Sequence, residues 1–272
     1  GLDSLTLCDL AHSAKTRPVL HIARDDARLA VIIDAISFFA PEIEVIALPA
    51  WDCLPYDRVS PHPEISSKRM AALSALANTA QKGPRIILTT INAVLQRVPP
   101  QSQVKKATLC LEKGAQLDME ELGDYLTAHG YHRTTTVGEP GEFAVRGGLV
   151  DLFPAGAENP IRIDFFGDEI DSLRPFDAVS QRTLELMDRH ILVPAGELTL
   201  SKEGIRCFRQ GYVAEFGTVT EEDPLYTAIS EGRRAQGAEH WLPLFYDTME
   251  SLFDYLPENT LCFLDHQVDE AG

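Results

Sequence analysis

The sequence predicts an α/β protein in which a parallel-sheet domain is interrupted by a smaller inserted α+β domain with an antiparallel sheet. Through about the first hundred residues, short apolar runs alternate with helical patterns, as in a parallel sheet covered by helices on both faces. From about residue 107, apolar and polar residues instead alternate singly, which is typical of antiparallel strands with one buried face. We therefore divide the 272-residue chain into 1–105, the first part of the α/β domain; 106–186, the inserted domain; and 187–272, a return to the α/β domain with a mainly helical part.

The first segment contains three predicted strands, at 18–23, 44–48 and 85–90, with helices between them. Asp25 offers a side-chain cap to the first helix. The apolar residues of that helix recur at the spacing of a single stripe, namely Leu29, Ile32, Ile33 and Ile36. A second helix is expected over 65–80, and a short helical turn follows the third strand. Pro99 and Pro100 place the first boundary, because proline lacks the amide donor that a continuing helix needs.

The inserted segment is expected to open with a strand through Leu109 and Leu111. A helix then starts at Asp118, with Glu121 at the capping-box position, and Gly130 ends it. The last segment shows helical spacing again at Ile205, Phe208, Tyr212 and Phe216, followed by an Asp223–Pro224 helix start and a final strand at 261–264.

The strongest alternation lies in the strand that starts at Ile161, where Arg162, Asp164 and Phe166 face away from the core. Gly167 and Asp168 suit a tight two-residue hairpin loop. Such a loop would place Phe165 opposite Ile170, and Asp164 opposite Asp171. Because opposed carboxylates repel, we expect Arg162, Arg146 or a partner to offset them.

Composition restricts the function. A net charge of −17 without a Lys/Arg cluster predicts little intrinsic nucleic-acid binding, and favours proteins or their basic patches as partners. No apolar stretch approaches the ~20 residues of a membrane span, and no secretory signal is visible. Five scattered cysteines predict reduced, mostly buried thiols in the cytoplasm rather than disulfides or a metal site. A first residue of Gly1 is expected of a processed chain or an excised fragment.

No motif for catalysis, a cofactor or a metal is found. The sequence has no phosphate loop of the form G-x-x-x-x-G-K-[ST], and Lys15–Thr16 resembles only its tail. Asp168–Glu169 resembles the acidic motif of helicase-type ATPases, but a hairpin explains it better. The segment 51–62, dense in aromatics and prolines, fits either a rigid loop across strand ends or a ligand cleft.

Arg146, Arg162 and Phe166 form the candidate site. Arginine and aromatic residues are enriched at protein interfaces, and a glycine pair follows Arg146. Alternation alone leaves a solvated sheet face and a protein-docking face equally open.

These residues lie within motifs that carry a family resemblance, including LPAWDCLPYDRVSPHPEISSKRMAAL, GEFAVRGGLVDLFPAG and IRIDFFGDEIDSLRPFD. Together they resemble the amino-terminal module of bacterial transcription-repair coupling factors (Mfd), which is itself similar to the excision-repair protein UvrB. The resemblance covers almost the whole chain. It implies a degenerate helicase-like (RecA-like) domain without ATPase activity, and an inserted domain that binds UvrA through Arg146, Arg162 and Phe166.

The resemblance therefore implies a non-catalytic recruitment module of transcription-coupled nucleotide excision repair that binds UvrA by mimicking UvrB. In that family RNA polymerase and DNA are bound through other domains, and the α/β domain continues beyond Gly272. The alternative is a fragment of a UvrB-like, ATP-dependent enzyme that binds damaged DNA.

Overall fold

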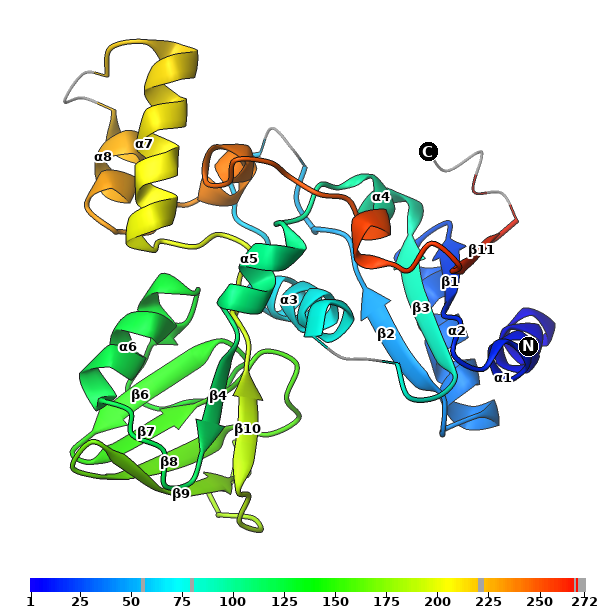
Figure 1. Ribbon diagram of the computed structural model, residues 1–272, viewed down its shortest axis with the longest axis horizontal. Coiled ribbons are helices and arrows are strands. Elements are labelled where there is room, and N and C mark those ends of the chain that lie inside the picture. The colour runs from blue at the N-terminus through cyan, green and yellow to red at the C-terminus, as the bar shows by residue number, and fades with distance from the viewer. Residues whose placement is uncertain (55–56, 79–80, 220–222, 267, 269–272) are drawn as a thin grey trace.

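A computed structural model describes residues 1–54, 57–78, 81–219, 223–266 and 268. Figure 1 shows three parts: a parallel sheet with its helices at the right, an antiparallel domain at the lower left and a small helical part at the upper left. Within the described residues, no helix is long and apolar enough to cross a membrane.

The parallel sheet contains four strands in the order β11-β1-β3-β2. Their bounds are β1 Val19–Ala23, β2 Glu44–Leu48, β3 Arg85–Thr90 and β11 Leu261–Leu264. All three pairings are parallel, with Val19 beside both Ile86 and Leu261. Because β11 comes from the end of the chain, the α/β domain is interrupted, as the sequence predicts.

Helices cover both faces of this sheet. On one face pack α1 (Leu2–Ala14) and α2 (Asp26–Phe39), with Leu29, Ile32 and Ile36 in the core. On the other pack α3 (Pro63–Asn78), α4 (Ile91–Leu95), α5 (Gln101–Lys106) and the 3-10 helix η2 (Leu252–Tyr255). Asp25 caps α2 as predicted, since its carboxylate accepts a 2.7 Å hydrogen bond from the Arg28 amide. The predicted end of α3, at 79–80, lies outside the described residues.

The inserted domain contains the helix α6, a five-stranded sheet of β5 to β9 and a two-stranded sheet of β4 and β10. Its elements are β4 Leu109–Glu112, α6 Met119–Ala128, β5 His132–Arg133, β6 Glu142–Arg146, β7 Leu149–Leu152, β8 Ile161–Phe166, β9 Glu169–Pro175 and β10 Arg189–Leu192. Strands β5 to β9 form one sheet in chain order, antiparallel except for the short β5–β6 pairing. Leu122 and Leu126 of α6 pack against the inner face of this sheet.

Strand β10 is missing from the sequence-based prediction, which expects helix beyond about residue 186. It pairs antiparallel with β4, so that Arg189 lies opposite Glu112 and Leu192 opposite Leu109. The strand has four residues, of which only Leu192 is buried. Four residues are too few to show a strand pattern of their own. The segment is a strand because it pairs with β4, which is far away in the sequence.

The helical part consists of α7 (Lys202–Phe216), α8 (Pro224–Ser230) and the 3-10 helix η1 (Ala238–Leu244). Phe208 and Tyr212 fill its core, whereas Phe216 is 58% exposed. One composition-based expectation is wrong: of the five cysteines only Cys8 is buried, and Cys110 and Cys262 are exposed. Both exposed thiols lie on strands, β4 and β11, whose residues alternate in burial there.

A buried ion pair joins α3 to the segment that follows β10. Nε of Arg69 donates to Oε1 of Glu197 over 2.7 Å, and the two side chains are 0% and 2% exposed. Nη1 of Arg69 also donates to the Pro49 carbonyl over 2.6 Å, and Nε1 of Trp51 donates to Oε2 of Glu197 over 3.1 Å. Removing one charge of a buried pair leaves the other uncompensated in a poorly solvated site.

We therefore predict that Glu197→Gln lowers the free energy of unfolding by about 3–5 kcal/mol, because the Arg69 charge loses its counterion. The measurement is urea unfolding followed by circular dichroism. Glu64→Gln is the matched control, since its 2.7 Å pair with Lys68 lies on the exposed surface of the same helix. That change should cost only about 0.3–0.5 kcal/mol, and equal losses in the two variants would contradict the prediction.

Candidate partner-binding face

Cross-strand pairing places Arg146, Arg162 and Phe166 on one face of the sheet β5–β9. Arg146 lies opposite Leu149, and Leu149 lies opposite Asp164 of β8. Arg162 and Phe166 flank Asp164 at alternate positions of the same strand. The neighbour Phe165 packs with the inner core, which turns Phe166 away from it. The geometry thus brings the three predicted residues to one face.

Two glycine turns shape the open end of this face. Gly147 and Gly167 have φ of +60° and +62°, the left-handed region that glycine adopts without strain. Each follows the last residue of a strand, Arg146 or Phe166, in a two-residue loop. Both hairpins therefore turn tightly, directly beside a candidate residue.

The predicted register of the second hairpin is correct at its tip and wrong further along. Phe165 lies opposite Ile170 as predicted, but Asp164 lies opposite Ser172 rather than Asp171. A register shift between Asp164 and Phe165 removes the expected carboxylate pair, since a bulge inserts an extra residue into one strand. The cation beside Asp164 is Arg174, and within the described residues neither Arg162 nor Arg146 forms an ion pair with Asp164.

Arg162 is held by a neighbour on β7. Its Nε and Nη2 donate to the two carboxylate oxygens of Asp151 over 2.7 and 2.8 Å. The guanidinium carbon also lies 4.8 Å from the centroid of the buried Phe176 ring. The hydrogen bonds to Asp151 raise the pKa of Arg162, against the opposing effect of burial. A bidentate pair fixes the plane of the guanidinium, so Arg162 is pre-oriented and 21% exposed.

Arg146 and Phe166 are more exposed to solvent than Arg162. Arg146 is exposed, and its Nη2 donates to the Thr135 carbonyl and, over 3.1 Å, to Oγ1 of Thr136. Phe166 is 83% exposed. The far end of the same face is covered by a small second core. The accessible part of the face is therefore the hairpin end that carries Arg146 and Phe166.

Alternation did not reveal the groups that orient the site. Asp151, Arg174 and Phe176 contact the candidate face, but each becomes identifiable only when the strand register is known. The resemblance of Asp168–Glu169 to an ATPase motif also has a structural explanation. Asp168 lies in the loop between β8 and β9, and Glu169 begins β9.

In the segment 51–62, of which residues 55–56 lie outside the described part, one end packs on α3 and the other borders a cavity. Trp51 packs beside Arg69, with the guanidinium carbon 5.8 Å from the ring. Ser60 and His62 line a cavity against the inserted domain.

Comparison with known proteins gives the family that the sheet β5–β9 matches. The family described as the UvrB interaction domain matches residues 109–198, which include the whole of the sheet β5–β9. Over all 272 residues the chain is 40% identical to the transcription-repair-coupling factor of Haemophilus influenzae, and covers 23% of that protein. It is 41% identical over 245 residues, or 90% of the chain, to that of Escherichia coli, covering 21% of it. With that of Rickettsia bellii it shares 34% identity over 98% of the chain and 23% of the relative.

Residues 109–198 therefore match the family described as the UvrB interaction domain, and they are carried by an interrupted α/β domain. The chain as a whole matches the amino-terminal, UvrB-like module of the transcription-repair-coupling factors. It spans roughly a quarter of the length of the curated relatives that it matches.

We predict that Asp151→Asn destabilises the inserted domain by about 2 kcal/mol. This loss is smaller than the ~3–5 kcal/mol of a fully buried pair, because Arg162 retains some solvent contact. The measurement is thermal unfolding of the 272-residue chain. Asp168→Asn, at the exposed hairpin tip, is the matched control and should stay within about 0.5 kcal/mol of the original. An unchanged midpoint in Asp151→Asn would show that the pair does not hold Arg162.

Proposed function

We propose that this chain is a non-catalytic recruitment module of transcription-coupled nucleotide excision repair, and that it binds UvrA by mimicking UvrB. The family of the inserted domain and the transcription-repair-coupling relatives support this assignment. In this proposal Arg146, Arg162 and Phe166 contact UvrA. RNA polymerase and DNA are partners of other parts of a full-length protein, and the setting is the cytoplasm.

The observation that carries the proposal is the exposure of Phe166. Phe166 is 83% exposed at the end of a hairpin whose other outward-facing side chains are polar. An aromatic ring of this size gains roughly 25 cal/mol for each Å² of apolar surface removed from water. A partner that covers Phe166 gains this free energy, whereas a face that remains in water does not.

The two arginines indicate which kind of partner surface the face would bind. Arg162 presents a guanidinium whose orientation Asp151 already fixes, so little conformational entropy is lost when it contacts a carboxylate. Arg146 stands beside the neighbouring hairpin tip. In a chain of net charge −17, two arginines on the same face as an exposed ring favour an acidic patch on the partner.

We predict that Phe166→Ala weakens binding of the 272-residue chain to UvrA by about 30-fold, as expected of an aromatic anchor worth ~2 kcal/mol. The unfolding midpoint should not fall, because the ring packs against little in the free chain. Phe38→Ala is the matched control: Phe38 is 81% exposed, but lies on α2 of the other domain. Titration calorimetry with purified UvrA measures both affinities. Full affinity in Phe166→Ala, or an equal loss in Phe38→Ala, would contradict the assignment.

The non-catalytic part of the proposal has a separate test. We expect no saturable binding of ATP in the presence of magnesium, because the sequence has no phosphate loop and Asp168 occupies a hairpin tip. Titration with a fluorescent ATP analogue measures it. Saturable, magnesium-dependent binding would instead support the UvrB-like enzyme fragment.

A further inference from the structure

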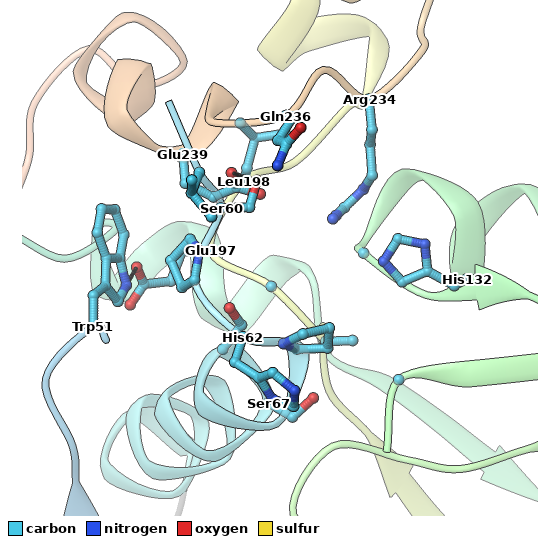
Figure 2. Close-up of a pocket in the computed structure, with 18 of the residues that line it drawn as sticks. Trp51, Ser60, His62, Ser67, His132, Glu197, Leu198, Arg234, Gln236 and Glu239 are labelled. Carbon is cyan, nitrogen blue, oxygen red and sulfur yellow. Dashed lines mark hydrogen bonds between the residues drawn. The ribbon is translucent and has the colours of Figure 1, made fainter. Parts of the chain in front are cut away.

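A cavity of about 390 Å³ lies where the three parts of the chain meet. Its walls come from the segment before and within α3 (His62, Ser67), from the inserted domain (Gly130, His132) and from the loop between α8 and η1 (Arg234). Figure 2 shows the Arg234 side chain extending toward His132, with His62 and Ser67 on the wall below. The cavity shares no residue with the face that carries Phe166.

Arg234 is the unusual residue of this cavity. Its Nε and Nη2 atoms are buried, and neither has a hydrogen-bond partner among the described residues. No ion pair of Arg234 is found in that part of the chain. Burial lowers the pKa of Arg234, and the more distant charge of Glu239 opposes that effect. A buried guanidinium without a counterion is costly, so such an arrangement calls for an anion.

The carboxylates of the cavity form no direct ion pair with Arg234 within the described residues, and each accepts a hydrogen bond from another donor. Glu197 accepts hydrogen bonds from Arg69 and Trp51. Glu239 accepts a 2.6 Å hydrogen bond from Oγ of Ser60. The positive charge of Arg234 therefore faces the cavity uncompensated by a direct contact.

Further donors and a close backbone approach complete the site. Oγ of Ser67 is buried and also lacks a partner among the described residues. Gly130, with φ of +99°, leaves room for the guanidinium, since a Cβ there would lie 2.8 Å from Nη2 of Arg234. Burial and the neighbouring Arg234 charge lower the pKa of His132. Its neutral ring keeps one N–H donor.

We propose that this cavity binds a small phosphate-type oxyanion, with Arg234 as the charged fork and Ser67 and His132 as hydrogen-bond donors. A guanidinium matches the oxygen spacing of phosphate in two parallel hydrogen bonds. The volume lies at the lower end of the range of small-molecule sites, which fits a pyrophosphate or a small phosphate monoester better than a large ligand. Such an anion would connect all three parts of the chain.

The test is titration calorimetry of the 272-residue chain with inorganic phosphate and with pyrophosphate, without magnesium and at constant ionic strength. Saturable binding to the original chain is expected, together with a rise in its unfolding midpoint. Arg234→Gln should weaken binding at least about tenfold, as expected for loss of a charge-assisted bidentate contact. The free Arg234→Gln chain should unfold at the same or a higher temperature, since it no longer buries an unpaired charge.

Arg233→Gln is the matched control, because Arg233 is the adjacent residue but is exposed and paired with Glu231. It should bind both anions like the original chain. Ser67→Ala, which removes one buried hydroxyl, should weaken pyrophosphate binding several-fold and tests the site even if Arg234→Gln fails to fold. The proposal is overturned if the original chain binds neither anion with a Kd below about 10 mM, if Ser67→Ala retains full affinity, or if a folded Arg234→Gln does. UvrA binding does not enter any of these measurements.

Discussion

The segment 195–200 is the constraint on which the arrangement of the three parts depends. The amides of Ala195 and Leu200 donate to the carbonyls of His129 and Ala128 at the end of α6, which fixes the inserted domain. Between them, the Glu197 carboxylate accepts from Arg69 of α3 and from Trp51. The Glu197 carbonyl accepts a 2.6 Å hydrogen bond from the Tyr246 hydroxyl, which follows η1. One short stretch of chain thus bonds to every part, and its central contact is a fully buried ion pair.

The junction around Glu197 and the open hairpin end differ in the contacts of their side chains. Around Glu197, side chains from separate parts of the chain hydrogen-bond to this one residue, which favours a single orientation of the parts. At the hairpins, Phe166 is left uncovered, while Asp151 holds Arg162 in place. A pre-oriented cation on the same face as an exposed ring reduces the entropy lost on binding, since that side chain is already ordered. The proposed recruitment of UvrA would use this combination of a fixed frame and an exposed binding surface.

Three arginines illustrate how the chain distributes positive charge. Arg69 is fully buried and paired, and Arg162 is partly exposed and paired. Arg234 has two buried nitrogen atoms without a partner in the described residues. A shortage of acid does not explain this difference, because the chain has 41 acidic and 24 basic residues. The carboxylates near Arg234 instead accept hydrogen bonds from other donors, so their geometry, and not their number, leaves Arg234 without a direct ion pair.

Features that depend on neighbours along the chain can be predicted from the sequence. Asp25 caps α2 because its carboxylate reaches an amide three residues on, and single alternation places Arg162 and Phe166 on one face of β8. Contacts between distant segments can be identified only from the folded structure. The bulge after Asp164, the pairing of Arg162 with Asp151 and the strand β10 all depend on register, and a shift of one residue exchanges the two faces of a strand. The cavity at Arg234 likewise joins three separate parts, because its walls meet only after each part has folded and packed.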